Sequence, residues 1–152
     1  MRSGLSRKDI AGRIKEIVAA LFRNIPSGVG SRRKDFKLSP KDQEKVLGQG
    51  ARWAVQQGFG NEEDLEHIEE KGCIEGARPD LVSTKALERG KDQLGTLGSG
   101  NHFIEVGYVE TVYDPVTAKG FGLFEDQMTV MVHTGSRGLG HQICDEAVKK
   151  LI

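Results

Sequence analysis

The chain has 152 residues, of which 37% are hydrophobic and 29% charged, with equal numbers of basic and acidic side chains; these values are typical of a soluble globular protein with one domain. An apolar run of six residues, 17–22, is far shorter than the roughly 20 needed to cross a bilayer, and no signal peptide is evident, so we expect a cytoplasmic protein with no membrane partner. The two cysteines, Cys73 and Cys144, have no metal-site spacing and are expected to be reduced packing residues rather than part of a disulfide framework or zinc ribbon.

The first helix is predicted to begin behind Ser6. Asp9 occupies the capping-box position three residues later, and Pro26 and Gly28 lie beyond the end of the helix. The apolar side of this helix recurs at helical spacing and consists of Ile10, Ile14, Ile17, Val18 and Leu21.

Three further helices are expected before residue 91. One begins at Ser39-Pro40 and ends near Gly58, with Trp53 in the core. A short acidic helix runs from its cap at Asn61 to Ile68, and another spans 79–89. His67, in the acidic helix, is expected at the surface rather than in a site.

The second half changes to the pattern of strands. Residues 103–113 are predicted to form one strand, and 128–132 a short, apolar, buried one. Gly135, Gly138 and Gly140 are expected to form a turn, followed by a helix with an apolar stripe that consists of Ile143, Cys144, Ala147, Val148 and Leu151. The glycine spacing matches neither a dinucleotide-binding fold nor a P-loop.

Two histidines lie beside glycine-rich turns in this second half. A neutral imidazole can bind a metal, so His102 and His133 are candidate ligands. Arg137 offers a planar guanidinium that suits phosphate oxygens. His141 is expected to support the site or cap the last helix rather than bind metal. Together these residues predict metal ions and a phosphate-bearing substrate in one site.

Strict strand alternation would put Asn101 and Glu105 on one face and His102 on the other. We therefore predict that residues 98–102 are irregular and that the strand begins near Phe103, so that His102 turns toward the pocket of Glu105.

The zero net charge conceals an uneven distribution. Residues 1–41 carry 11 Lys and Arg against 3 Asp and Glu, whereas residues 42–152 carry 11 against 19. Arg32, Arg33 and Lys34 follow a glycine-containing segment and are predicted to lie on an exposed loop. Such a loop either contacts an RNA backbone or is exposed to solvent without a binding role.

Several segments resemble, in order and spacing, blocks of the RtcB family of RNA-splicing ligases. They are NIPSGVGS (24–31), GARWAV (50–55), EGARP (75–79), LGSGNHFIEV (97–106) and MVHTGSRGLGHQ (131–142). The resemblance covers the chain from about Gly4 to its last residue. It implies an RtcB-like α+β fold with helices in the first half and strands with glycine-rich active-site loops in the second. Residues 1–152 would be the central part of a single ligase domain.

The resemblance also implies an activity. The family uses GTP and two manganese ions to join an RNA 3'-phosphate or 2',3'-cyclic phosphate end to a 5'-hydroxyl end, through a guanylylated histidine, in tRNA splicing and RNA repair. His102 and His133 would each bind one ion, Asn101 and Glu105 would lie near the guanylate, and Arg137 would act catalytically on the RNA phosphate. Cleaved RNA such as tRNA halves would be the substrate, and an activating protein is a further partner to test.

The chain departs from the family pattern in two respects. It has no Asp-x-x-Cys block before its first helix, and it stops before the family's later histidines, including the one that accepts guanylate. Because two histidines alone hold manganese poorly, we expect an internal, incomplete portion of the domain that is inactive by itself. Two alternatives from other classes stay open: a metal-dependent phosphohydrolase and a non-catalytic RNA-binding fragment.

Overall fold

The computed structural model describes residues 1–33 and 38–152, which form two compact units. The first unit consists of Met1–Arg32 and Gly95–Gly135, and the second of Arg33–Leu94 and Ser136–Ile152. Helices combine with a small antiparallel sheet, in agreement with the predicted α+β class. No helix within the described ranges is long and apolar enough to span a membrane.

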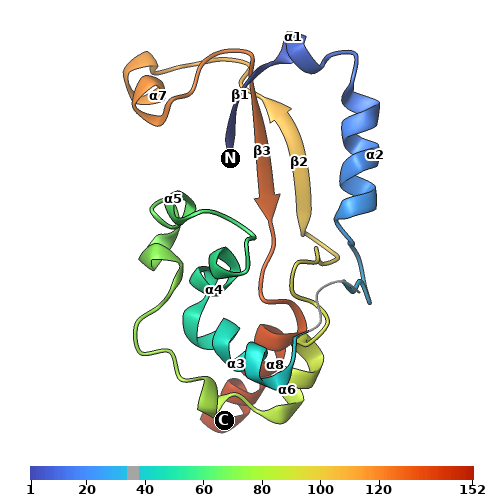
Figure 1. Cartoon of the computed structure of the whole chain (residues 1–152), viewed down its shortest axis with the longest axis vertical. Coiled ribbons are helices and arrows are strands. Elements are labelled where there is room, and N and C mark those ends of the chain that lie inside the picture. The colour runs from blue at the N-terminus through green and yellow to red at the C-terminus, as the bar shows by residue number, and fades with distance from the viewer. Residues whose placement is uncertain (34–37) are drawn as a thin grey trace. The chain divides into compact units, whose positions relative to one another are not determined.

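The first unit is built on a three-stranded sheet (Figure 1). Strand β3 (Gln127–His133) lies between β1 (Arg2–Ser6) and β2 (Phe103–Tyr108), and both pairings are antiparallel. The prediction of two strands is confirmed, although β2 ends at Tyr108 rather than at residue 113. Strand β1 was not predicted, because its sequence lacks an alternating apolar pattern.

Strand β3 is only partly buried. Met128 is 6% exposed, as expected for a buried strand, but Met131 is 59% and Val132 46% exposed. Gln127, which is buried, donates from Nε2 to the carbonyl oxygens of Ser3 (2.9 Å) and Gly122 (3.2 Å). The prediction of burial is therefore right for the start of the strand and wrong for its end.

The predicted first helix is divided into α1 (Arg7–Ile10) and α2 (Ile14–Asn24), with a turn that contains Gly12, a weak helix former. Ser6 caps α1 as predicted, since its backbone N–H and its hydroxyl each donate to Oδ2 of Asp9 at 2.7 Å. Helix α2 runs alongside β2 in Figure 1, and none of its residues is buried.

A short helix that was not predicted, α7 (Pro115–Phe121), lies between β2 and β3 in the sequence. Asp114 caps it, because Oδ1 accepts hydrogen bonds from the backbone N–H groups of Val116 and Thr117.

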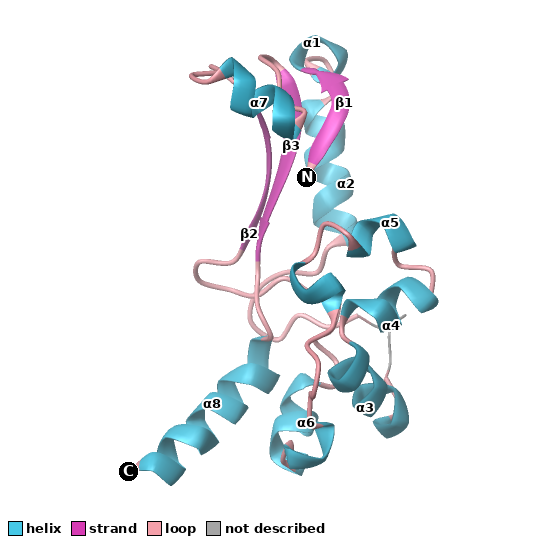
Figure 2. Ribbon diagram, turned by 90° about the vertical axis from the view of Figure 1, so that its left-hand side faces the viewer, coloured by secondary structure: helices cyan, strands magenta, loops and turns pink. Residues whose placement is uncertain are grey.

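The second unit is helical (Figure 2). Ser39 caps α3 as predicted, and Trp53 is buried as predicted. The predicted second and fourth helices are each interrupted, the second at Gly50 and the fourth after Leu81, and the acidic helix ends at Leu65. The elements are α3 (Pro40–Gln49), α4 (Ala51–Gln56), α5 (Glu62–Leu65), η1 (Glu69–Gly72), η2 (Pro79–Leu81), α6 (Thr84–Gly90) and α8 (Arg137–Leu151).

Helices α6 and α8 pack together, and a polar network joins them. Gln142, only 2% exposed, accepts a hydrogen bond from Arg89 at 2.8 Å and donates to Glu146 at 2.9 Å. Ser83, the cap of α6, donates to the same carboxylate at 2.8 Å. Hydrogen bonds from Ser83 and Gln142 hold the pKa of Glu146 below its usual value.

Three predictions for this region are wrong in detail. Helix α8 begins at Arg137, so Gly138 and Gly140 are helical rather than part of the turn. The apolar stripe predicted for this helix is not buried, and its one buried residue is Gln142. Cys144 is exposed and therefore not a packing residue, whereas Cys73 is half-buried with its Sγ 3.3 Å from the carbonyl oxygen of Gly48.

Candidate functional site

The segment before β2 is irregular, as predicted, and brings the ring of His102 against the main chain. Residues 98–102 lie outside the strand, which begins at Phe103. A Cβ atom on Gly98 would lie 2.0 Å from Nδ1 of His102, so a side chain at this position would displace the ring. Gly98 therefore makes room for the imidazole. The sequence showed the glycine but not this contact, which depends on the path of the loop.

The two predicted metal ligands meet in the structure. His102 directly precedes β2 and His133 ends β3, and their ring centroids are 6.1 Å apart with the planes at 70°. Because the strands are antiparallel, the start of β2 lies beside the end of β3. Sheet pairing thus joins two side chains that are far apart in the sequence.

Phe103 contacts the ring of His133 from the neighbouring strand. The two residues are partners in the register, and their rings are stacked with centroids 5.7 Å apart and planes at 16°. A pair of this kind contributes on the order of 0.5–1.5 kcal/mol beyond the burial of area. Phe103 therefore helps to orient the imidazole, a role that was not predicted from the sequence.

Asn101 contacts the same imidazole. Its Nδ2 lies 3.3 Å from Nε2 of His133. With the amide in this orientation, Nε2 accepts the hydrogen bond and the neutral ring carries its proton on Nδ1. A metal ion on Nε2 of His133 would have to displace the amide of Asn101.

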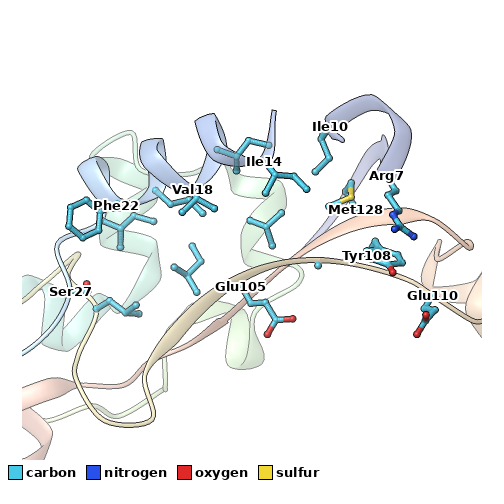
Figure 3. Close-up of a pocket in the computed structure, with 17 residues that line it drawn as sticks. Arg7, Ile10, Ile14, Val18, Phe22, Ser27, Glu105, Tyr108, Glu110 and Met128 are labelled. Carbon is cyan, nitrogen blue, oxygen red and sulfur yellow. The ribbon is translucent and has the colours of Figure 1, made fainter. Parts of the chain in front are cut away.

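Glu105 shares a face of the sheet with Phe103 and His133. Its register partner is Met131, and residues two apart on a strand point to the same side. The side chain is exposed and points away from α2 in Figure 3. The carboxylate therefore lies on the histidine side of the sheet. A pocket common to Glu105 and His102 stays a prediction.

The donor set fits a metal centre only in part. Nδ1 of His102 is buried and has no hydrogen-bond partner, as expected for a nitrogen kept for a ligand. Within residues 1–33 and 38–152, however, no group of three or more His, Cys, Asp or Glu residues is placed to hold an ion. Protein metal sites normally use at least three ligands. The described residues thus bring together two imidazoles, fewer than such a site normally needs.

Arg137 begins α8 in the second unit with an unusual backbone. Its φ is 53°, a conformation that is uncommon outside glycine and that is often found at functional sites. The next residue is fixed closely: the backbone N–H of Gly138 donates to Oε1 of Gln93 at 2.8 Å, and a Cβ on Gly138 would lie 2.9 Å from that oxygen. The strained arginine is therefore held at the start of the helix.

The basic segment follows a stretch that is tethered to the loop of His102. Leu97 donates its backbone N–H to the carbonyl oxygen of Pro26 at 2.9 Å, and the Ser31 hydroxyl donates to the carbonyl oxygen of Leu97 at 3.1 Å. Arg32 is exposed and Arg33 half-buried. Lys34 lies outside the described residues. The sequence did not reveal that two family-like segments, 24–31 and 97–106, lie side by side.

The other two histidines lie in the second unit. His67 is exposed, as predicted. His141 is also exposed and is the fifth residue of α8, so it does not cap that helix, because the helix begins earlier than expected. A supporting role for His141 stays a prediction.

Comparison with known proteins gives one family. A family model described as "tRNA-splicing ligase RtcB" matches residues 1–152. Curated relatives named tRNA-splicing ligase RtcB include those of Archaeoglobus fulgidus, 51% identical over 99% of this chain, Thermococcus kodakarensis, 53% over 98%, and Pyrococcus abyssi, 54% over 98%. The chain spans 32%, 31% and 16% of the length of these three relatives.

Proposed function

Because the chain belongs to the RtcB family of tRNA-splicing ligases, we propose that it forms part of an enzyme that joins RNA 3'-phosphate or 2',3'-cyclic phosphate ends to 5'-hydroxyl ends with GTP and manganese. The observation that carries the proposal is the meeting of the His102 and His133 rings in a chain matched throughout by the family model. The substrate is cleaved RNA such as tRNA halves, the compartment is the cytoplasm, and both compact units belong to one ligase domain.

In this proposal His102 and His133 each bind one of two manganese ions. Bound manganese would neutralise charge on the phosphates during phosphoryl transfer. Gly98 leaves space for the His102 ring, and Phe103 stacks on His133, so both imidazoles are oriented before an ion arrives. The remaining ligands come from residues other than this pair, because two imidazoles hold manganese weakly.

Asn101 and Glu105 are proposed to contact the guanylate beside the histidines. The Asn101 amide already lies within hydrogen-bond reach of His133, and Glu105 lies on the same side of the sheet. Arg137 is proposed to bind the RNA phosphate through its guanidinium, which suits paired phosphate oxygens. The unusual φ of Arg137 supports a functional role for that residue.

Arg32, Arg33 and Lys34 are proposed to contact the RNA backbone. Each phosphate neutralised by a basic side chain adds about 0.7–0.9 to the slope of log affinity against log salt. Charge reversal at all three positions should flatten this slope for RNA binding. An unchanged slope would reject the contact.

A chimera tests the ligase proposal. In the Archaeoglobus fulgidus relative, the matching region is replaced by this chain, and RNA joining is measured with GTP and manganese. We expect sealing by the chimera, loss of sealing in H102A and H133A, and normal sealing in H67A, since His67 is exposed and outside the site. A folded chimera that seals equally well with and without the two site histidines contradicts the proposal.

The isolated chain is proposed to be inactive, because the described residues place only two imidazoles together. The same assay on the purified chain should give no joined RNA. Robust sealing by the chain alone would refute this part of the proposal. GTP-dependent labelling of the chimera separates a ligase from a phosphohydrolase, which needs no guanylate.

A further inference from the structure

An apolar groove separates α2 from the sheet in the first unit (Figure 3). Its volume is about 680 Å³. The apolar side chains of β2 that line it, Ile104 and Val106, alternate with Phe103 and so belong to the face opposite His133. The residues that define it come from the helix and from two strands: Ile14, Val18, Phe22, Ile104, Val106 and Met128.

The helix side of the groove is only partly covered by the described residues of the first unit. Val18 is 56% and Phe22 83% exposed, although both line the groove (Figure 3). An amphipathic helix normally buries its apolar side against a core. Contiguous apolar side chains at the surface mark an interaction site. Helix α2 therefore presents an apolar surface that its own unit does not fully cover.

The strand side of the groove follows an open sheet edge. Strand β2 lies at the end of the order β1-β3-β2, so one of its edges has no partner strand within the described part of the chain. Successive residues 104–108 all line the groove, which shows that the groove runs along the backbone of the strand rather than under one face alone. An open edge of this kind accepts an added strand.

We propose that the groove receives an extended segment that pairs with the open edge of β2 and directs alternate apolar side chains toward α2. The segment belongs to the part of an RtcB ligase that lies outside the region matched by this chain. This inference rests on family membership and not on the metal or RNA chemistry proposed above.

The length of the relatives argues for this occupant. The chain spans only 32% of the Archaeoglobus fulgidus relative and 31% of the Thermococcus kodakarensis relative, so about two thirds of each polypeptide is available to cover the groove. The chemistry of the groove argues for a strand with apolar side chains, since the backbone edge supplies hydrogen bonds and α2 supplies an apolar wall. Arg7, whose guanidinium lies 4.5 Å above the ring of Tyr108, covers that ring at the rim.

Overlapping peptides provide the test. Peptides of about 15 residues, longer than a typical strand, are made to cover the unmatched parts of the Archaeoglobus fulgidus relative, and their binding to the intact chain is measured by fluorescence anisotropy. We expect one peptide, or a few overlapping ones, to bind and to slow amide hydrogen exchange in Phe103–Tyr108 by about tenfold or more. The assay contains neither RNA nor metal, so its outcome is independent of the ligase proposal.

Matched variants locate the binding site. V18K/F22K places charges in the groove at side chains that are already exposed, so the fold should be retained and peptide binding should fall by about tenfold or more. V116K changes a side chain that is 83% exposed and does not line the groove, and it should bind normally. Circular dichroism of each variant verifies folding.

Three results would overturn the proposal. The first is that no peptide binds. The second is binding that leaves exchange in β2 unchanged. The third is a dimer of the chain in sedimentation equilibrium that V18K/F22K dissociates, because the occupant would then be a second copy.

Discussion

Glycine permits a close approach in both compact units, but toward atoms of different kinds. In the second unit a Cβ on Gly50 would lie 2.2 Å from the carbonyl oxygen of Gly72, and Gly50 has a φ of 55°. In the first unit Gly98 faces the imidazole of His102. A backbone carbonyl cannot move without shifting α4 or η1, whereas an imidazole can rotate. One glycine therefore protects the fold, and the other protects the geometry of the candidate site.

The largest effect is expected from Gly50→Ala. The added methyl group meets both a forbidden backbone conformation and a main-chain oxygen, so the free energy of unfolding should fall by about 3 kcal/mol. Gly58→Ala is the control, because Gly58 has a φ of 82° but nothing within 4 Å of an added Cβ, and it should cost about 1 kcal/mol. Urea denaturation measures both losses, and equal losses would show that the Gly72 contact is unimportant.

Gly98→Ala should separate function from stability. The displaced ring is a side chain, so unfolding should change by less than about 1 kcal/mol, while manganese affinity should fall by about 10- to 100-fold, as when a group that orients a metal ligand is lost. Gly12→Ala adds a methyl group in open space and should leave affinity unchanged. Normal manganese affinity in Gly98→Ala would show that Gly98 does not protect the geometry of the candidate site and that the proposed difference from Gly50 is wrong.

Phe103→Leu should have a smaller effect on the same site. Loss of the stacked ring removes about 1 kcal/mol of contact with His133 and should shift the imidazole proton resonances through the lost ring current. Tyr113→Leu, at a residue 94% exposed, serves as the control. Unchanged His133 resonances in Phe103→Leu would show that the two rings are not stacked in solution.

The smallest effect concerns pH and the polar network of the second unit. The pKa of Glu146 is lowered by hydrogen bonds from Ser83 and Gln142, so its ionised form stabilises the fold above the unfolded pKa, and this contribution is lost as pH falls through the folded value. Ser83→Ala should raise the pKa of Glu146. The free energy of unfolding should then decrease less as the pH is lowered. Carboxyl NMR titration measures the pKa of Glu146, and urea denaturation between about pH 3 and pH 6 measures the pH dependence of the free energy of unfolding. Ser39→Ala, which removes the hydrogen bond to Asp42, should leave Glu146 unchanged.

Local sequence signals predicted the element types and several caps. Ser6 and Ser39 occupy the predicted positions because capping depends on neighbours in the sequence. Trp53 is buried as expected for a large apolar side chain. Strand β1 was missed because its pairing with β3 is a long-range interaction. The breaks at Gly12 and Gly50 were missed because isolated glycines are compatible with a continuing helix until tertiary contacts are known.

For the candidate site, the chemistry of the residues and the resemblance both indicated His102 and His133, and the irregular loop was predicted from strand alternation. The contributions of Gly98 and Phe103 were not predicted, since they depend on distances between segments that only sheet pairing brings together. The apolar stripe of α8 did not predict which residue of this helix is buried. The buried residue is Gln142, whose side-chain amide makes hydrogen bonds within the α6–α8 pair.

Paramagnetic NMR with manganese tests most directly whether the two histidines form one cation-binding site. Substoichiometric Mn²⁺ should broaden the imidazole resonances of His102 and His133 before those of His67 and His141, and H102A/H133A should abolish this selectivity. Broadening that begins instead in the acidic segment 62–70, or that is the same in the double variant, would contradict the account.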